Sequence, residues 1–454
     1  MTLTEKILAR ASGKPWVRPG DNVWVNVDVL MTHDVCGPGT IGVFKREFGK
    51  NAKIWDRKKV VIIPDHYIFT ADAMSNRNVD ILREFANEQG IEYFYDVIDD
   101  PKGQWRFDAV KGNGQRQFGN RYSGVCHSSL AQKGHNRPGE VLFGTDSHTC
   151  QSGAFNQFAT GIGNTDAGFI MGTGKLLIKV PETMRFALEG ALTKGVMGKD
   201  IILNLIGEIG SDGATYRALQ FEGPGVSTLS MDDRMTITNM AIEAGGKNGI
   251  FTCDQQTLDY VNARNGTKST FEPVEPDADQ KVVFDHTFDL SKLEPTVACH
   301  PDPGHRKLAK ELGHIKLDRA YIGSCTGGKT SDFLAFAEIV KGKSVKIDTF
   351  GVPSTTEVLD ELKATQWDGQ SVWEILASAG VRLTENPGCA ACLGGPADTF
   401  GRVNTAGIKC ISATNRNFPG RMGHKESQVF LASPYTVAAS ALTGKITDPR
   451  EFLC

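Results

Sequence analysis

The sequence predicts an α/β protein with several domains, and three observations lead to this prediction. Short apolar runs alternate with segments of helical periodicity along much of the chain, which is typical of α/β folds. A length of 454 residues exceeds one ordinary hydrophobic core, so about two to four domains are expected. The polar, proline-bearing stretch from 265 to about 303 is typical of a linker or a loosely packed crossing between domains. We therefore expect domains at 1–180, 181–290 and 291–454.

The predicted strands lead into residues that can do chemistry. The predicted strands are Lys59–Ile63, Glu140–Phe143, Arg319–Ile322 and Ile408–Ile411. The predicted helices are Ala73–Gln89, Met231–Ala244 and Ser331–Val340. An acid and a histidine follow each of the first two strands, Cys325 follows the third, and Asn415-Arg416 follows the fourth. Because ligands bind at the carboxyl ends of strands in open α/β sheets, these ends predict one shared site.

The composition argues against several classes of protein. Hydrophobic residues make up 40% and charged residues 23% of the chain, as in globular proteins. A net charge of −3 gives no reason to expect a broad nucleic-acid-binding face, and no run of about 18 apolar residues predicts a membrane span. The N-terminal segment has no signal-peptide core, and ten dispersed cysteines do not form a disulfide framework. We therefore expect a reducing, cytoplasmic setting.

Three cysteines in glycine-rich frames are the most informative residues. They occur in Gly-Ser-Cys325-Thr-Gly-Gly and Pro-Gly-Cys389-Ala-Ala-Cys392-Leu-Gly-Gly. Glycine leaves bare backbone that can approach a bulky inorganic ligand closely. A closed zinc site or a fully ligated iron–sulfur cluster needs four ligands, so three thiolates on a four-iron cluster leave one iron open as a Lewis acid. The alternatives are ordinary buried cysteines, a zinc site completed from elsewhere, and a redox Cys-x-x-Cys pair.

Acid–histidine neighbours are candidates for proton transfer. A carboxylate can fix the tautomer of a histidine and raise its pKa, and both Asp65-His66 and Asp146-Ser147-His148 contain these groups. His127 lies in a stretch of small residues, where a structural histidine is the alternative.

Two arginines and one helix face complete the candidates. Arg416 and Arg421 lie five apart in a loop, and guanidinium forks match carboxylates bidentately, which predicts a substrate with several carboxylates. Surface or interdomain salt bridges are the alternative for this pair. Asn239 and Glu243 lie at i and i+4 of the predicted helix, so both can face one cleft.

Taken together, these motifs resemble the aconitase superfamily, and within it most closely the family of 3-isopropylmalate dehydratase large subunits. The resemblance covers essentially the whole chain, with the motifs in the expected order. It is carried by Gly-Thr-Asp146-Ser-His148-Thr, Gly-Ile-Gly163-Asn-Thr-Asp166, Gly-Ser-Cys325-Thr, Pro-Gly-Cys389-Ala-Ala-Cys392-Leu-Gly and Asn415-Arg416-Asn-Phe-Pro-Gly-Arg421-Met-Gly.

The resemblance implies a hydro-lyase with a three-domain α/β/α architecture around one [4Fe–4S] cluster per subunit. Three cysteines would hold the cluster, and its open iron would bind the substrate hydroxyl and a carboxylate. The implied cluster ligands are Cys325, Cys389 and Cys392. Acid–histidine pairs would surround the leaving hydroxyl: Asp65 with His66, Asp146 with His148, and His127 with Glu243. Asn239 and Asn415 would orient cluster-bound groups, and substrate would bind to Ser147, Arg416 and Arg421.

The chain departs from the aconitase pattern in three places. Aconitases continue into a C-terminal swivelling domain that carries a serine base and another arginine, whereas this sequence stops at Cys454. The resemblance therefore implies a separate small subunit that supplies this domain. Gly-Gly-Lys follows Cys325-Thr, where many relatives have asparagine after the threonine. The early segment Thr32-His33-Asp34-Val-Cys36-Gly-Pro-Gly also differs, so no glutamine ligand is carried over.

The reaction implied is the reversible isomerisation of 2-isopropylmalate to 3-isopropylmalate through isopropylmaleate, in leucine biosynthesis. Homoaconitase and substituted-malate dehydratases remain alternatives, because the residues that select the third substituent lie largely on the small subunit in this family. A cluster-free RNA-binding regulator is an alternative from another class, disfavoured by the net charge and the missing fourth domain. A carboxylate-binding scaffold without turnover is disfavoured because cysteines, histidines and arginines occur together.

Overall fold

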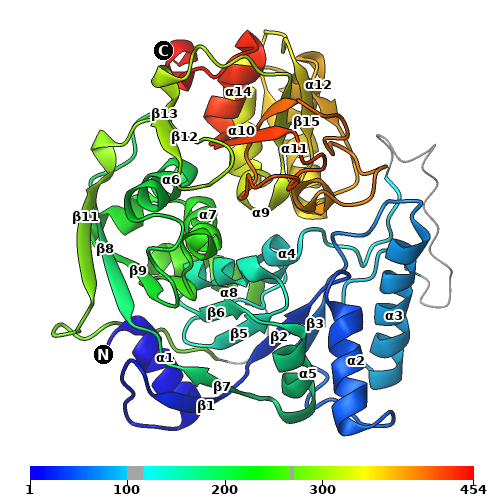
Figure 1. Ribbon diagram of the computed structural model, residues 1–454, viewed down its shortest axis with the longest axis vertical. Helices are drawn as coiled ribbons and strands as arrows, with labels where there is room; N and C mark the ends of the chain where they lie inside the picture. The colour runs from blue at the N-terminus through cyan, green and yellow to red at the C-terminus, as the bar shows by residue number, and fades with distance from the viewer. Residues whose placement is uncertain (100–115, 266–269, 454) are drawn as a thin grey trace.

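The computed structural model describes residues 1–99, 116–265 and 270–453. In these residues a five-stranded, a four-stranded and a seven-stranded sheet form the frame, with two two-stranded ribbons beside them. Figure 1 shows the C-terminal sheet and its helices at the top, and the N-terminal elements below and to the right. The fold is an α/β architecture with helices packed against the sheets. No helix in this part of the chain is long and apolar enough to cross a membrane.

The five-stranded sheet is parallel and has helices on both faces. Its order is β4 (Tyr93–Phe94), β3 (Val60–Ile62), β2 (Val29–Thr32), β5 (Val141–Gly144) and β6 (Phe158–Gly161). Its helices are α1 (Leu3–Ser12), α2 (Gly37–Phe48), α3 (Ala73–Gln89), α4 (Cys126–Gln132) and α5 (Asn164–Thr173). Alternate residues of β5 face opposite cores, since Phe143 packs with α2 and α5 while Leu142 packs with α4. An antiparallel ribbon of β1 (Asn22–Asn26) and β7 (Lys175–Lys179) lies beside it.

The four-stranded sheet is also parallel. Its order is β10 (Asn248–Phe251), β9 (Ala218–Glu222), β8 (Thr183–Glu189) and β11 (Phe284–Asp289). Its helices are α6 (Gly198–Ile209), α7 (Met231–Asn239) and α8 (Gln255–Asn265). The 3-10 helices of the described residues are η1 (Ser147–Phe155), η2 (Pro224–Thr228), η3 (Met240–Ala244), η4 (Leu290–Lys292), η5 (Ala309–Glu311) and η6 (Pro449–Phe452).

The seven-stranded sheet is parallel except around β12. Its order is β13 (Arg306–Leu308), β12 (Thr296–Ala298), β20 (Gln428–Ala432), β19 (Lys409–Ser412), β14 (Arg319–Ile322), β15 (Asp348–Gly351) and β18 (Arg382–Leu383). Its helices are α9 (Ser324–Gly327), α10 (Thr330–Val340), α11 (Thr356–Ala364), α12 (Val372–Ser378), α13 (Ala390–Leu393) and α14 (Pro434–Thr443), beside a ribbon of β16 (Gln366–Trp367) and β17 (Gln370–Ser371). Ile322 packs against α10 and α14, whereas Tyr321 belongs to the core that contains α6. Helices therefore cover both faces.

Two sequence predictions about the elements were wrong. The stretch from 265 to 303 contains β11 and β12, and β11 pairs with β8 along its full length. As an edge strand β11 buries only Phe288, so its polar composition resembles that of a loop. The predicted helix Met231–Ala244 is interrupted, because the α-helix ends at Asn239 and a 3-10 turn follows. The carbonyl of Asn239 accepts a hydrogen bond from the Cys150 thiol at 3.1 Å.

The predicted strands and the other helices are confirmed to within a residue or two of their ends. Each of the three larger sheets draws its strands from one of the expected segments, and the domain boundaries themselves stay a prediction. The N-terminal and C-terminal segments come into direct contact at Gly124, which forms a bridge with Thr355. A Cβ atom at Gly124 would collide with the Ser354 carbonyl, so only glycine allows this approach.

Candidate active site

The three predicted cysteines lie together at the meeting point of the sheets. Cys325 opens α9 directly after β14, and Cys389 and Cys392 lie at the start and inside of α13. Their exposed fractions are 2%, 5% and 2%, and the three side chains form one buried cluster with Val125. Ser324, just before Cys325, has a φ of 69°, a left-handed conformation that a non-glycine residue adopts at a cost of about 1–3 kcal/mol. Such strain is frequent at functional sites.

Hydrogen bonds among the thiols favour the charged form of two of them. A hydrogen bond from Cys389 lowers the pKa of Cys325 to about 6, and the nearby rings of His127 and His148 lower it further. A hydrogen bond from Cys389 also holds the pKa of Cys392 well below its ordinary value. Thiolates are the form in which cysteine binds metals, so this pocket fits an iron–sulfur cluster.

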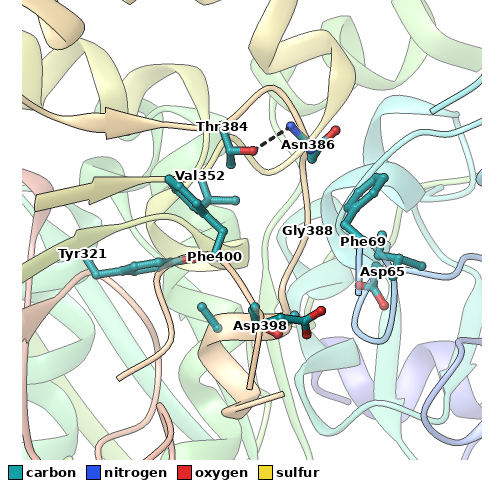
Figure 2. A pocket seen from close by; sticks show the side chains of 13 residues that line it. Asp65, Phe69, Tyr321, Val352, Thr384, Asn386, Gly388, Asp398 and Phe400 are labelled. Carbon is teal, nitrogen blue, oxygen red and sulfur yellow. Dashed lines mark hydrogen bonds between the residues drawn. The ribbon is translucent and has the colours of Figure 1, made fainter. Parts of the chain in front are cut away.

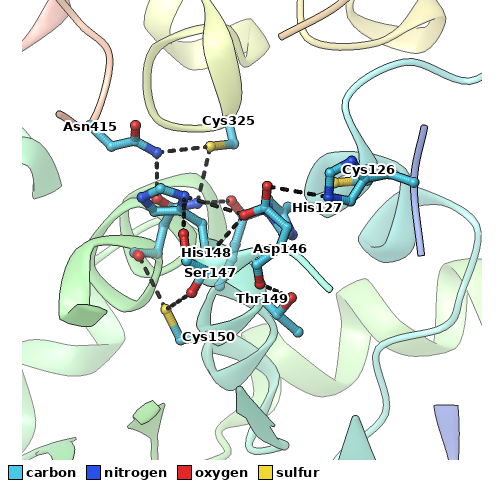
Figure 3. Close-up of polar contacts among 12 residues, drawn as sticks. Cys126, His127, Asp146, Ser147, His148, Thr149, Cys150, Cys325 and Asn415 are labelled. Carbon is cyan, nitrogen blue, oxygen red and sulfur yellow. Dashed lines mark hydrogen bonds and ion pairs between the residues drawn. The ribbon is translucent and has the colours of Figure 1, made fainter. Parts of the chain in front are cut away.

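The two predicted asparagines contact these sulfur atoms. The amide of Asn239 donates to Cys325 Sγ at 3.1 Å. The amide of Asn415 donates to the same sulfur atom at 3.4 Å (Figure 3). Asn415 also accepts from the Cys392 thiol at 3.2 Å and donates to Asn239 at 3.2 Å. These amides tie the cysteine of α9, the cysteine of α13 and the end of α7 into one buried network.

Asp146 and its histidines form the second part of the site, at the end of β5 (Figure 3). His127 Nε2 lies 3.0 Å from Asp146 Oδ1, and His148 Nδ1 lies 3.3 Å from the same oxygen. His148 Nε2 lies 2.7 Å from Glu243 Oε1. The implied pair of His127 with Glu243 is therefore a wrong pairing: Asp146 lies between the rings of His127 and His148, and Glu243 reaches His148 instead.

The charges in this group stabilise one another. Burial favours neutral Asp146, but His127 and His148 hold its pKa well below the ordinary value. Burial and Arg416 oppose charge on His148, whereas hydrogen bonds to Asp146 and Glu243 raise its pKa to about 9. His148 is thus protonated at neutral pH and is the stronger candidate for a general acid.

Asp65 and His66 follow β3, and His66 Nε2 lies 3.9 Å from Asp146 Oδ2. His66 Nδ1 lies 2.7 Å from Asp65 Oδ1, and Asp65 Oδ2 accepts from the Cys126 backbone N–H at 2.8 Å. The Asp65 carbonyl accepts from the Cys389 N–H at 2.9 Å. Burial opposes charge on His66, but Asp65 raises its pKa above the ordinary value.

Sequence reasoning missed His33 and Asp34, which follow β2, the strand between β3 and β5. His33 stacks on His66 with ring centroids 4.9 Å apart, and its Nε2 lies 3.8 Å from Asp146 Oδ2. Asp34 accepts hydrogen bonds from the backbone N–H groups of Asp65 and His66, both at 3.1 Å, and from that of Tyr67. A third acid–histidine neighbour at a strand end was the available signal. The ligand atoms of His33, Asp34, Asp65 and His66 lie within 4.8 Å of one another, a donor set that could hold a cation.

The predicted substrate residues lie around the histidines. Arg416 Nε donates to Glu243 Oε1 at 2.7 Å, and Ser147 Oγ lies 3.4 Å from His148 Nδ1. Arg421 has no hydrogen-bond partner for its buried Nε within the described residues. The two arginines thus differ, since Arg416 is already held by a carboxylate and Arg421 keeps donor capacity for a ligand.

Comparison with known proteins decides the family. Residues 5–311 and 302–444 match the model of the aconitase family (aconitate hydratase). The chain belongs to the aconitase family. It is 57% identical over 458 residues to the chloroplastic 3-isopropylmalate dehydratase large subunit of Arabidopsis thaliana, covering 100% of this chain and 87% of that protein. It is 44% identical over 454 residues to 3-isopropylmalate dehydratase large subunit 1 of Methanopyrus kandleri, covering 100% and 99%.

A further relative and one solved structure extend the comparison. The probable 3-isopropylmalate dehydratase large subunit of Methanothermobacter thermautotrophicus is 42% identical over 455 residues and covers 99% of both chains. The holo form of aconitase X from Thermococcus kodakaraensis aligns with a TM-score of 0.46 at 11% identity, covering 87% of this chain and 84% of that one. Membership of the aconitase family implies an aconitase-type hydro-lyase with an iron–sulfur cluster, which agrees with the buried cysteines.

A small cavity lies behind the α13 turn of this aconitase-family chain (Figure 2). Gly388, Ala390 and Ala391 line it opposite Phe69, with Asp65 at one end. Its volume is about 40 Å³, and on this measure one water needs about 10–15 Å³. The cavity has room for a few waters and is too small for a substrate with several carboxylates. Neither Arg416 nor Arg421 lines it, so this cavity is separate from the predicted substrate-binding arginines.

Proposed function

We propose that the chain is the cluster-bearing large subunit of 3-isopropylmalate dehydratase and isomerises 2-isopropylmalate to 3-isopropylmalate through isopropylmaleate. The single observation that carries this proposal is the buried convergence of the three cysteines beside two networks of acids and histidines. The relatives that carry this name match the whole chain, which supports the choice of substrate.

The cofactor is a [4Fe–4S] cluster, one per subunit, held by Cys325, Cys389 and Cys392 with one iron free of protein ligands. When bound, such a cluster supplies a Lewis acid that polarises the substrate hydroxyl. The amides of Asn239 and Asn415, which donate to Cys325 Sγ, orient this thiolate and are expected to tune the cluster through its sulfur atom.

The residues of the chain itself position substrate and move protons. His148 is protonated at neutral pH because Asp146 and Glu243 favour its charged form, so it can donate a proton to the departing hydroxyl oxygen. Asp146 is shared with His127 and keeps both rings oriented toward the same point. His66, held by Asp65, is the second candidate donor, and its Nε2 lies 3.9 Å from Asp146 Oδ2.

Carboxylate recognition belongs to Arg421, Arg416 and Ser147. The unpartnered Nε of Arg421 suits a bidentate bond to a substrate carboxylate. Arg416 is oriented by Glu243 and has its remaining guanidinium N–H groups for a second carboxylate. This arrangement fits a small di- or tricarboxylate and gives specificity for carboxylates rather than for the third substituent.

The partner is a small subunit that supplies the swivel domain, its catalytic serine and a further arginine, so that the active enzyme is a heterodimer. The serine would remove a carbon-bound proton of the substrate. The setting is cytoplasmic, with no nucleic acid or membrane among the partners. The relatives named as large subunits support this division of the enzyme.

The test is anaerobic turnover by the cluster-reconstituted chain mixed with its small subunit. Isopropylmaleate should form from 2-isopropylmalate only when both subunits are present. The Cys389→Ala variant should stay folded and lose turnover. The Cys253→Ala variant should keep turnover, since Cys253 is a partly exposed cysteine in the loop between β10 and α8. Turnover of homocitrate or of another substituted malate, with none of 2-isopropylmalate, would reverse the choice of substrate, and full activity of Cys389→Ala would contradict the cluster.

A further inference from the structure

Lys199 is a buried lysine that the mechanism above does not use. It lies in the first turn of α6, in the middle segment of the chain, and its exposed fraction is 1%. It is among the largest fully buried side chains of the described residues. Burial of an ammonium group is costly unless hydrogen bonds and a counter-charge compensate for the lost hydration. The position of this lysine therefore needs a physical reason.

The ammonium group of Lys199 joins two loops that come from the C-terminal sheet. Its Nζ donates to Thr326 Oγ1 at 3.3 Å, in the α9 turn that follows β14. It also donates to the carbonyls of Ala413 at 3.2 Å and Thr414 at 2.5 Å, in the loop that follows β19. Thr326 Oγ1 donates to the Ala413 carbonyl at 2.9 Å, so the lysine completes a link that already joins the loops.

These are the loops that carry the cluster ligand and its amide partner. Thr326 is next to Cys325, and Thr414 is next to Asn415. Asn415 in turn contacts the sulfur atoms of Cys325 and Cys392. A shift of either loop relative to the other would therefore change the spacing of the sulfur atoms.

No carboxylate lies within ion-pair distance of Lys199 in the part of the chain that the structure describes. The neighbouring Asp200 uses its carboxylate to accept from the Met197 and Thr296 backbone N–H groups, at 2.9 and 2.8 Å. By contrast Lys329, the other buried lysine near the cysteines, pairs with Asp332 at 2.9 Å. Among the described residues no direct ion pair thus balances the charge of Lys199, and Asp332 and Asp200 act on it only through space.

The cysteines are among the negative groups that favour a charged Lys199. Burial and the charge of Lys329 lower the pKa of Lys199 to about 7, whereas the charges of Cys325, Cys392 and Asp332 act in the opposite direction. A four-iron cluster in its 2+ core state with three thiolates carries a net negative charge. Because Lys199 has no direct ion pair within the described chain and holds Thr326, next to Cys325, a bound cluster would bring negative charge close to its ammonium group.

We propose that Lys199 is a positioning residue that braces the two cluster-bearing loops and supplies the buried positive charge that balances the cluster. The inference rests on the proposed function for the presence of the cluster. The charge predicts an electrochemical effect, because a nearby cation stabilises the reduced cluster, and the net charge around an iron–sulfur cluster sets its reduction potential. The hydrogen bonds predict a separate effect on how firmly the cluster is held.

The experiment compares Lys199→Met, which removes donor and charge, with Lys199→Gln, which keeps a hydrogen-bond donor. Lys247→Met is the matched control, since Lys247 is a half-buried lysine over the ring of Tyr216 with Asp166 as its charged neighbour. The native chain is first shown to bind four iron and four sulfide and to turn over with its small subunit, which tests the proposed function by itself. The readouts for the variants are iron and sulfide content, the midpoint potential of the reduced cluster by electron paramagnetic resonance, and the half-life of the cluster in air.

Both Lys199 variants should shift the midpoint potential to more negative values. Lys199→Met should also shorten the half-life of the cluster about 5-fold or more, and Lys199→Gln should shorten it less. If Lys199→Met does not fold, Lys199→Gln tests the effect of the charge on the midpoint potential. Thr326→Val then tests the hydrogen bonds between the two loops, and this variant should shorten the half-life of the cluster without changing its midpoint potential. A native potential in Lys199→Gln, or an equal shift in Lys247→Met, overturns the proposal.

Discussion

The Nε2 atom of His148 lies 2.7 Å from the Oε1 atom of Glu243, although 95 residues separate them in the sequence. The contact joins the 3-10 turn after β5 to the 3-10 turn after α7, and the same carboxylate oxygen accepts from Arg416 of the C-terminal segment. One carboxylate thus links all three segments of the chain at the candidate active site. Four predictions follow from the contacts of this site.

Replacing Glu243 by glutamine should reduce turnover by about 100-fold or more, because His148 loses the group that keeps it protonated and Arg416 loses its anchor. The measurement is steady-state kinetics of the reconstituted enzyme with its small subunit. Glu140→Gln is the control. Glu140 forms an ion pair with Arg137, 2.9 Å apart, and this pair is not part of the candidate site. If Glu243→Gln had the same kcat as the native enzyme, Glu243 would have no role in the mechanism.

The stability conferred by this pair should depend on pH. The pKa of His148 is raised from 6.5 to about 9, so its contribution is fully present below about pH 6.5 and is lost as the pH rises through 9. The pKa of Glu243 is lowered from 4.5 despite its burial, so its contribution is present above about pH 4.5 and is lost as the pH falls below that. Urea unfolding of native protein and Glu243→Gln should differ most near pH 5.5–6.5 and least above pH 9. A difference that stays constant from pH 5 to 9.5 would contradict this assignment.

Replacing Arg421 by lysine should raise KM for the dicarboxylate about 10-fold or more with a small change in melting temperature. Lysine lacks the planar guanidinium fork that binds a carboxylate bidentately. The stability should change little, because the buried Nε of Arg421 makes no hydrogen bond within the described residues. Arg185→Lys is the control, because Arg185 pairs with Asp285 and Glu222 on the middle sheet. Equal KM values for Arg421→Lys and the native enzyme would show that another group binds the carboxylate.

Replacing Asp34 by asparagine should destabilise the fold by about 1–3 kcal/mol and lower kcat. The carboxylate accepts from three consecutive backbone N–H groups, of Asp65, His66 and Tyr67, and thereby fixes the turn that carries His66. Asp72→Asn is the control, since Asp72 caps α3 through Ser75. The measurement is chemical denaturation beside kinetics, and a variant as stable and as active as the control would refute the role of Asp34.

The sequence predicts which side chains gather at the candidate site but not how they pair. The cysteines, the arginines and two of the three acid–histidine strand ends are visible as local motifs in a chain of apolar strands. The partner of a side chain depends on which strands are neighbours, and the order β3, β2, β5 cannot be derived from a single sequence. That order places His33 between Asp65 and Asp146, and its position was therefore missed.

The interrupted helix shows a second limit. Periodicity predicts Met231–Ala244 as one helix, yet the last turn tightens where Cys150 Sγ bonds to the Asn239 carbonyl. The Cys150 thiol lies about 90 residues earlier in the sequence, so no local sequence pattern predicts this contact. Likewise the polar edge strand β11 resembles a loop because only its pairing with β8 makes it a strand. Tertiary contacts override local preference in both cases.

The central claim is that three thiolates hold a four-iron cluster whose remaining iron binds substrate. Mössbauer spectroscopy of the chain reconstituted with ⁵⁷Fe, recorded with its small subunit before and after addition of 2-isopropylmalate, tests it most directly. We predict four irons per chain, with the signal of one in four changed by the substrate and the other three unchanged. Four irons that all stay unchanged while turnover proceeds, or turnover by iron-free protein, would contradict the account.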